Sequence, residues 1–391
     1  MSPRLPGLPF EPYESLSERP HVMVDGAARP SSVLTLSHWP QSPTPPELAR
    51  DVSASIVLEY LRLASPGGAN ASVAGARAVR RAIARGRLAE AVTNDHFDED
   101  GLVSVFALVD PEAALAHAEL LVAVATCGDF GVVHEPAVAR MAFAIAPLAE
   151  AEAGAGSGTS ERYRATLPRL GELLEHPERF ERYFADELSE LAYGQEAIAG
   201  GEVVITEEGA LDLAIVERAS SHRTSGDRIP GAEGGLPVHA AAVHSATSAS
   251  RIIAFDGAAC ECYLRYEGWV KTVSRQVPLR PDLSPLAARL TAEEPSGLAW
   301  EANGVGAIVA RLRPGGDGCS EIDPARIVTL VGDYLASADP AWDPWRAGGG
   351  HIPVQERPGY ASSYGRSRPR PVRPARPRPG RPARRRRRGG D

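Results

Sequence analysis

The segment Asn94-Asp95-His96-Phe97-Asp98-Glu99-Asp100-Gly101-Leu102-Val103-Ser104 carries most of what this chain reveals about its fold. The pattern before it predicts a short strand over residues 88–93, and the apolar run after it predicts a helix over 101–109. One imidazole and two carboxylates therefore stand at H-x-D-x-D spacing where a strand ends and a helix begins. Ligands bind at the carboxyl ends of strands in open α/β sheets, so this turn is a candidate binding site.

Two further predicted strands end in residues of the same chemical kind. The strand at 22–24 ends at Asp25, and the strand at 32–36 ends just before His38. Helix-forming segments separate these strands, which predicts an α/β fold with a mostly parallel sheet and flanking helices. Because parallel strands end at one edge of a sheet, we expect Asp25, His38 and residues 96–100 to share one site.

Composition and hydrophobic pattern divide the chain into segments. A Gly/Ala-rich stretch predicts a linker, and a period-two apolar pattern predicts a second, smaller α+β domain. The Pro/Arg-rich end of the chain predicts disorder. The expected segments are an irregular N-terminal arm (1–20), an α/β metal-binding domain (21–150), a linker (151–160), a helical segment (161–200), an α+β domain (201–338) and a disordered basic tail (339–391).

Charge is distributed unevenly along the chain. Residues 366–391 hold twelve arginines and one aspartate, which is a charge of +11. Because the net charge of the chain is −8, the remaining residues carry −19. Such an acidic body argues against a nucleic-acid groove on the folded part. The tail either binds polyanions non-specifically, folds back on the acidic body, or is a low-complexity segment without a function.

The chain has no apolar stretch of roughly 18 residues and no signal-peptide pattern, which predicts a cytoplasmic protein without a membrane partner. Its four cysteines do not form a disulfide framework in a chain of 391 residues. Cys260 and Cys262 fit buried apolar positions better than a zinc pair, because no second pair of thiols accompanies them.

The H-x-D-x-D-G segment predicts a site for a hard divalent cation. Carboxylates with an imidazole favour Mn²⁺ or Mg²⁺ over thiophilic ions, and two such ions can activate water and stabilise a leaving phosphoryl oxygen. A calcium EF-hand is excluded, because His96 occupies the first ligand position and Ala107 the position of the bidentate glutamate. A solvated acidic loop without function remains the alternative.

The same segment resembles the first motif of the DHH-type phosphoesterase superfamily, with Ser104 as the small or hydroxyl residue that follows it. The resemblance implies an α/β catalytic domain in which a manganese pair serves the hydrolysis of phosphodiesters or phosphoanhydrides. It implies metal binding by His96, Asp98 and Asp100, and it favours Mn²⁺ over Mg²⁺.

Other fragments extend the resemblance in a rearranged order. Asp25 resembles the family's aspartate that follows a strand, and Leu36-Ser37-His38-Trp39-Pro40 resembles its D-H-H triplet, with Ser37 and Trp39 as replacements. Both fragments precede the first motif here, which implies a circularly permuted or diverged domain. Gly348-Gly349-Gly350-His351 is either the family's phosphate-contacting G-G-G-H or a chance occurrence among 38 glycines.

The whole chain also resembles an uncharacterised bacterial protein family. The similar segments are V-D-G, L-S-H-W-P, H-F-D-E-D-G and W-V-x-x-x-S-R, which lie within residues 20–335. This resemblance implies no activity.

Several other residues have two interpretations. Asp129 is either a further metal ligand or a turn residue after a helix that ends at Gly128. His239 and His244 are better explained as core or surface histidines than as a metal pair. Arginines near Trp269 are either phosphate contacts or, as we prefer, solvated residues of a sheet surface; they are Arg265, Arg275 and Arg280.

The hypothesis that follows is a metal-dependent phosphoesterase that acts on a phosphate-containing small molecule or a short oligonucleotide. The expected metal ligands are His96, Asp98, Asp100, Asp25 and Asp129, and the expected catalytic residues are Asp98, Asp100 and His38. An arginine from the second domain would contact the phosphate. The alternative is a non-catalytic metal- or nucleotide-binding regulatory protein on a degenerate fold of the same type.

Overall fold

The structure is a computed structural model that describes residues 7–65, 76–219, 235–316 and 318–346. The G-G-G-H fragment and nearly all of the predicted disordered tail lie outside these residues. The described part has a mixed α/β fold with a parallel sheet, flanking helices and a second α+β region, and this confirms the predicted fold class.

The first sheet is parallel, as predicted. It consists of β1 (His21–Val24), β2 (Ser32–Leu36) and β3 (Ala91–Thr93), in the order β2-β1-β3. Every residue of β1 and β3 is buried, as expected when helices cover both faces of a parallel sheet. The three carboxyl ends therefore lie together at one edge.

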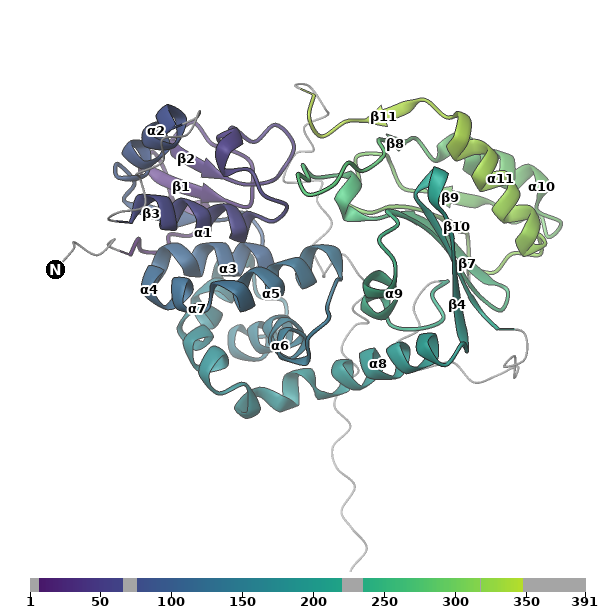
Figure 1. The fold of residues 1–391 in the computed structure, drawn as a ribbon, viewed down its shortest axis with the longest axis horizontal. Coiled ribbons are helices and arrows are strands. Elements are labelled where there is room, and N and C mark those ends of the chain that lie inside the picture. The colour runs from purple at the N-terminus through teal and green to yellow at the C-terminus, as the bar shows by residue number, and fades with distance from the viewer. Residues whose placement is uncertain (1–6, 66–75, 220–234, 317, 347–391) are drawn as a thin grey trace, which may run out of the picture.

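Helices follow these strands and form a layer beside the sheet (Figure 1). Ala-, Leu- and Val-rich faces of these helices build most of the core. Their bounds are α1 (Ser53–Ala64), α2 (Ala76–Gly86), α3 (Glu99–Val109), α4 (Pro111–Ala116), α5 (Ala118–Phe130), α6 (Pro136–Ala153), α7 (Thr159–Glu175) and α8 (Glu181–Ala199). The long helix α8 runs from this layer to the second sheet (Figure 1).

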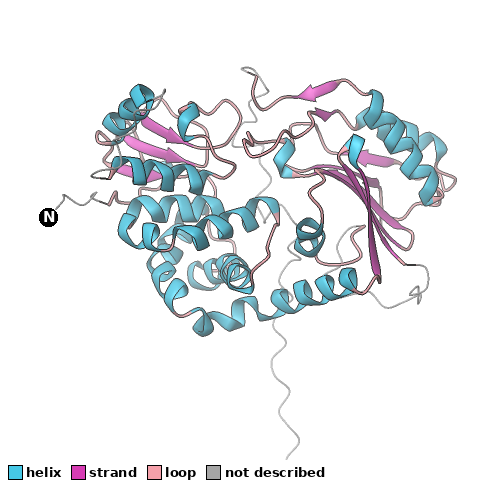
Figure 2. Ribbon diagram, viewed as in Figure 1, coloured by secondary structure: helices cyan, strands magenta, loops and turns pink. Residues whose placement is uncertain are grey.

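The second sheet has six strands in the order β4-β5-β6-β7-β10-β9 and is antiparallel except for the parallel pair β5/β6 (Figure 2). Its strands are β4 (Val203–Glu208), β5 (Leu213–Arg218), β6 (Arg251–Asp256), β7 (Ala259–Leu264), β9 (Trp300–Ala302) and β10 (Ala310–Pro314). The accompanying helices are α9 (Ala240–Ala246), α10 (Ser284–Glu293) and α11 (Pro324–Ser337).

Alternation along β6 places the two faces of this sheet in different cores. Ile252 and Ala254 join the main core with α9, whereas Ile253 and Phe255 pack with α10 and α11 in a second core. The main core continues without interruption from the first sheet through the helices to the second sheet. The second sheet is thereby held against the first domain.

The structure corrects two boundaries. Residues 340–342, assigned above to the tail, form strand β11 (Pro340–Trp342), which pairs with β8 (Arg280–Pro281). Trp342 anchors this strand to the folded part of the chain, because its buried indole N–H donates to the Trp269 carbonyl at 3.1 Å. The N-terminal arm is also paired in part, since Phe10 forms a parallel bridge with Val92 of β3.

Short 3₁₀ turns complete the described secondary structure. They are η1 (Tyr13–Ser15), η2 (Pro46–Leu48), η3 (Pro177–Phe180), η4 (Gly209–Leu211) and η6 (Tyr266–Gly268). Within the described ranges, no helix combines the length and the apolar character that crossing a membrane requires.

Candidate metal centre

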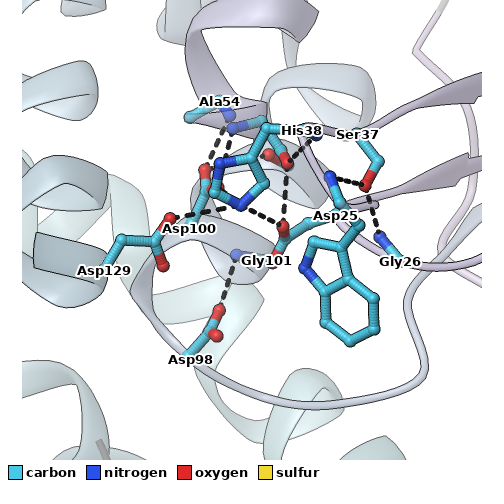
Figure 3. A network of polar contacts seen from close by, with 12 residues as sticks. Asp25, Gly26, Ser37, His38, Ala54, Asp98, Asp100, Gly101 and Asp129 are labelled. Atoms are coloured by element: carbon cyan, nitrogen blue, oxygen red, sulfur yellow. Dashed lines mark hydrogen bonds and ion pairs between the residues drawn. The ribbon is translucent and has the colours of Figure 1, made fainter. Parts of the chain in front are cut away.

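The carboxyl ends of the three parallel strands bring the predicted ligands together (Figure 3). Asp25 follows β1, His38 lies just beyond β2, and the His96–Asp100 segment follows β3. Asp25 has a left-handed backbone with φ of 43°, a conformation that aspartate tolerates better than most residues. Such backbone strain is common where a side chain must be aimed at a site.

One ligand set consists of Asp25, His96 and Asp98. The His96 Nε2 atom lies 3.1 Å from Asp25 Oδ2 and 3.1 Å from Asp98 Oδ2. One ligand atom from each of the three residues falls within 4.8 Å of the others, which is close enough to hold a cation.

A second ligand set consists of Asp25, His38 and Asp100, with ligand atoms again within 4.8 Å of one another. The His38 Nε2 atom lies 3.4 Å from Asp25 Oδ1 and 3.8 Å from Asp100 Oδ2. It also lies 3.4 Å from Asp129 Oδ2, and Figure 3 shows the His38 ring pointing between Asp25 and Asp129. This buried Asp129 oxygen accepts no hydrogen bond from the described residues.

Asp25 is common to both sets. Its Oδ2 atom faces His96, and its Oδ1 atom faces His38. A carboxylate whose two oxygens face two ligand sets has the geometry of a bridging ligand in a two-ion site.

Backbone and carboxylate groups orient both histidine rings. His38 Nδ1 donates to the Asp51 carbonyl oxygen at 2.5 Å, and His96 Nδ1 lies 2.9 Å from Asp95 Oδ1. Partners of this kind on Nδ1 are typical of metal-binding histidines, because they leave Nε2 to bind the ion.

Helix N-termini support the carboxylates. The first N–H groups of α1, from Ser53 and Ala54, donate to Asp100 at 2.7 and 2.6 Å, and the Ser53 hydroxyl donates to Asp25 at 2.8 Å. Asp98 caps α3 by accepting from the Gly101 N–H at 2.8 Å. The positive ends of two helices thus stabilise negative charge at the centre.

The neighbours of His38 shape the site without supplying ligand atoms. Ser37 Oγ accepts from the N–H groups of Gly26 and Trp39, both at 3.1 Å, and so joins the loops after β1 and β2. The Trp39 ring stacks on His96 with centroids 5.1 Å apart.

Burial and charge together perturb the carboxyl groups of the centre. Burial alone would raise the pKa of Asp25, but hydrogen bonds from His38 and His96 bring that pKa below its usual value. Burial, with the nearby Asp25 charge, raises the pKa of Asp100 to about 7. Burial and the charge of Asp100 raise the pKa of Asp129 well above its usual value.

The two histidines shift in the direction that favours their charged forms. Burial opposes the charge of His38, but its hydrogen bond and proximity to Asp25 raise the pKa of the ring. Burial likewise opposes charge on His96, yet the charge of Asp98 and its hydrogen bonds raise that pKa well above the usual value. In the absence of a cation, protons compensate this buried cluster of carboxylates.

The donor set fits a hard divalent ion. Its donors are carboxylate oxygens and imidazole nitrogens, with no cysteine among the residues of either set. Oxygen-rich sites with imidazole suit Mn²⁺, and carboxylate oxygens also suit Mg²⁺. The described residues could therefore hold a metal ion at a buried centre.

Comparison with known proteins identifies the chain at the level of family. Residues 7–344 match the model of a family of unknown function, DUF6687. The chain belongs to this family. The matched range contains both ligand sets, the second sheet and β11. No curated protein and no solved structure matches the chain.

Two glycines allow close approach around the centre. A Cβ atom on Gly101 would lie 2.6 Å from Asn94 Nδ2 and 2.7 Å from Tyr163 Oη. A Cβ atom on Gly128 would lie 2.5 Å from Glu99 Cβ, so this glycine lets α5 pack closely on α3. Gly128 is inside α5, and the helix ends instead at Gly131, whose φ is 64°. The interpretation of Asp129 as a turn residue after a helix that ends at Gly128 is therefore wrong.

Gly101→Ala is expected to destabilise the protein by about 1–3 kcal/mol, because the new methyl group overpacks a buried site. Urea denaturation measures this loss. Gly171→Ala in α7 is the matched control, since no atom lies within 4 Å of its Cβ position. This control is expected to gain about 0.5–1 kcal/mol from helix propensity. Equal stabilities for Gly101→Ala and the parent would contradict the packing described here.

The arginines near Trp269 are structural, so our preference for solvated residues is wrong for two of them. Arg265 and Arg280 are 1% and 2% exposed. Arg265 donates to carbonyl oxygens and pairs with Glu267 at 2.7 Å, and Arg280 donates to carbonyl oxygens of neighbouring loops. Arg275 pairs with Asp212 at 3.4 Å.

The remaining side chains with two interpretations are also structural. His244 is buried, and its Nε2 atom lies 2.8 Å from the Tyr263 hydroxyl. His239 caps α9. Cys260 and Cys262 are buried as predicted, and burial raises the pKa of each thiol to about 12. These thiols are therefore unreactive at neutral pH.

Sequence reasoning missed several side chains that reach the centre, among them Ser53, Asp95 and Tyr266. The Tyr266 hydroxyl, from the turn after β7, lies 3.3 Å from His38 Nε2 although 228 positions separate the two residues. No local pattern predicts such a contact, because it depends on how the two sheets pack.

Proposed function

We propose that this protein is a metal-dependent phosphoesterase that uses two divalent ions, Mn²⁺ in preference to Mg²⁺. The observation that carries the proposal is the shared carboxylate of Asp25. One of its oxygens faces His96, and the other faces His38. Pairs of ions about 3.5–4 Å apart, held in this way, are typical of phosphatases and nucleases.

The spatial arrangement supports the resemblance to DHH-type phosphoesterases. The H-x-D-x-D residues His96, Asp98 and Asp100 lie beside Asp25 and His38, although the chain presents these pieces in a permuted order. Asp129 adds a carboxylate oxygen 3.4 Å from His38 Nε2. A permuted domain preserves such a site, because the sheet edge, and not the chain order, determines which residues meet.

Bound ions would supply an activated water and stabilise charge on the phosphoryl group. The chain's own residues would hold the reacting groups in place. Asp25 would bridge the two half-sites, and the N-terminus of α1 would support Asp100 and Asp25 through Ser53 and Ala54. Asp51 and Asp95 would fix the rings of His38 and His96.

Hydrolysis of a generic phosphodiester in the presence of Mn²⁺ tests this proposal. We expect turnover by the parent and a loss of about 10³-fold, or about 4 kcal/mol of transition-state stabilisation, in Asp98→Asn. Asp110→Asn is the matched control, because Asp110 is exposed at the start of α4 and asparagine also caps helices. Turnover that persists unchanged in Asp98→Asn would refute the assignment.

Burial of the centre favours a second candidate, a metal-binding regulatory protein without catalysis. Asp25 and Asp100 are 1% and 0% exposed, and Trp39 packs over His96. Tight Mn²⁺ binding without hydrolysis of phosphodiesters or phosphoanhydrides would select this candidate over the first.

A further inference from the structure

Tyr163, on α7, has a buried hydroxyl that lacks a hydrogen-bond partner. Its side chain is 0% exposed, and its hydroxyl makes no hydrogen bond with any described residue. A buried polar group that has lost water and gained no other partner destabilises the folded state, so such groups are rare in native proteins. An unpartnered hydroxyl beside a candidate site therefore points to a ligand that completes it.

The first turn of α3 shows where this hydroxyl lies. Asp98 caps the turn by accepting from the Gly101 N–H (Figure 3). Because Gly101 has no Cβ atom, three polar atoms converge on the position that a Cβ would occupy. They are Asn94 Nδ2 at 2.6 Å, Tyr163 Oη at 2.7 Å and Asp98 Oδ1 at 3.1 Å. The Tyr163 hydroxyl thus lies beside the His96–Asp98 half of the centre.

Aromatic contacts fix the direction of the Tyr163 ring. Phe10 stacks on it with centroids 4.9 Å apart, and Phe97 meets it edge-on with centroids 5.1 Å apart. Phe10 is itself held by its bridge to Val92 of β3, and Phe97 lies between His96 and Asp98 in the chain. The hydroxyl is therefore aimed at the centre by residues that belong to the same sheet edge.

The Tyr163 hydroxyl supplies what the two ligand sets lack, a neutral hydrogen-bond donor. Burial and the charge of Asp98 raise its pKa well above the usual value, so the phenol keeps its proton. Asn94 adds a second neutral donor, because its amide nitrogen donates to the Asp25 carbonyl at 3.3 Å and carries a further N–H. Neutral donors bind an anionic oxygen without the positive charge that would repel bound ions.

We propose that Tyr163 is a substrate-binding residue whose hydroxyl donates to a phosphoryl oxygen at the His96–Asp98 half of the centre. This inference rests on the proposed phosphoesterase function. His96 and Asp98 are 8% and 6% exposed, whereas His38 and Asp100 are 2% and 0% exposed, so a substrate would approach the His96–Asp98 half first.

Binding of inorganic phosphate to the Mn²⁺-loaded full-length protein tests the proposal without relying on turnover. Isothermal titration compares the parent with Tyr163→Phe, which keeps the ring and its aromatic contacts. We expect the dissociation constant for phosphate to rise by about 10- to 100-fold in Tyr163→Phe, the effect of losing a hydrogen bond to a charged group. The dissociation constant for Mn²⁺ is expected to stay that of the parent.

Thr166→Val is the matched control. Thr166 lies three residues further along α7, is also 0% exposed, and its hydroxyl also has no hydrogen-bond partner among the described residues. It belongs to neither ligand set. Both variants remove an unpartnered hydroxyl and nearly keep the shape of the side chain, but Thr166→Val is expected to bind phosphate with the affinity of the parent.

Urea denaturation of the metal-free variants separates a ligand-binding hydroxyl from one that holds a structural water. We expect the urea midpoint of Tyr163→Phe to be no lower than that of the parent, because the hydroxyl has no partner to lose. A lower midpoint together with unchanged phosphate affinity would mean that a water already satisfies the hydroxyl, and this result would overturn the proposal.

Other results distinguish failure of this inference from failure of the proposed function. Phosphate affinity that falls equally in Tyr163→Phe and Thr166→Val would report the packing of α7 and would overturn the role of Tyr163 alone. Weaker Mn²⁺ binding in Tyr163→Phe would also overturn it, because the residue would then act on the ion site. A parent that binds Mn²⁺ but neither binds phosphate nor hydrolyses phosphoesters would overturn the proposed function together with this inference.

Discussion

Replacement of Asp25 by asparagine is expected to abolish the binding of both ions. Asparagine keeps the size of the side chain but removes the charge that faces His96 and His38. We expect the parent to bind two Mn²⁺ per chain, Asp25→Asn to bind none, and Asp98→Asn to bind one. Equilibrium dialysis with metal analysis measures these stoichiometries, and hydrolysis in Asp25→Asn should fall by at least about 10³-fold.

The contrast between Asp25 and Asp98 is the informative part of this experiment. Both carboxylates are buried, and both lie 3.1 Å from His96 Nε2, but only Asp25 belongs to the two ligand sets. Asp110→Asn should again bind two ions. If Asp25→Asn retained an ion at either set, Asp25 would not be a bridging ligand.

The second large effect is on pH dependence. Raising the pH from about 5 to about 8 is expected to destabilise the metal-free protein. The pKa of Asp100 is about 7 in the folded state and 3.8 when unperturbed, so between these values the folded state keeps a proton that the unfolded state has lost. Stability therefore falls as pH rises across this window, by a few kcal/mol.

The other titratable groups of the centre also contribute to the pH dependence of stability. The raised pKa of Asp129, like that of Asp100, makes the folded state less stable as the pH rises. The raised pKa values of His38 and His96 contribute stability that is complete below the unperturbed value of 6.5 and is lost as pH rises through the folded values. The lowered pKa of Asp25 contributes stability above 3.8 that is lost only in stronger acid, below this window.

Mn²⁺ should reverse the effect of pH. Metal binding displaces the protons of the cluster, so Mn²⁺ is expected to bind more tightly at pH 8 than at pH 6. At a free concentration of 100 times the dissociation constant, each ion adds about 2.7 kcal/mol of stability. Urea denaturation at several pH values, with Mn²⁺ and with a chelator, measures both effects. Metal-free protein that is more stable at pH 8 than at pH 5 would contradict the pKa shifts described above.

The parallel sheet and the position of the centre could be predicted from the sequence because both depend on local patterns. Short apolar runs identified the three strands, and Asp25 and His38 follow two of them directly. The carboxyl ends of parallel strands share one edge, so the order of the pieces along the chain did not matter.

Features that depend on packing between distant elements were not predictable. One of the two interpretations of Asp129 ends the helix at Gly128, because a glycine after an apolar helix resembles a cap, whereas this glycine makes room for Glu99 of α3. Arg265 and Arg280 were expected at a solvated surface, but their carbonyl partners come from loops that only the fold brings near. The contact between the Tyr266 hydroxyl and His38 likewise depends on how distant elements pack.

The two-ion centre is tested most directly by the anomalous scattering of crystals grown with Mn²⁺. A two-ion centre would give two peaks about 3.5–4 Å apart on either side of the Asp25 carboxylate, with one peak beside His96 and Asp98 and the other beside His38 and Asp100. No anomalous peak at these residues when Mn²⁺ is in excess, or a single peak that Asp25 does not contact, would contradict it.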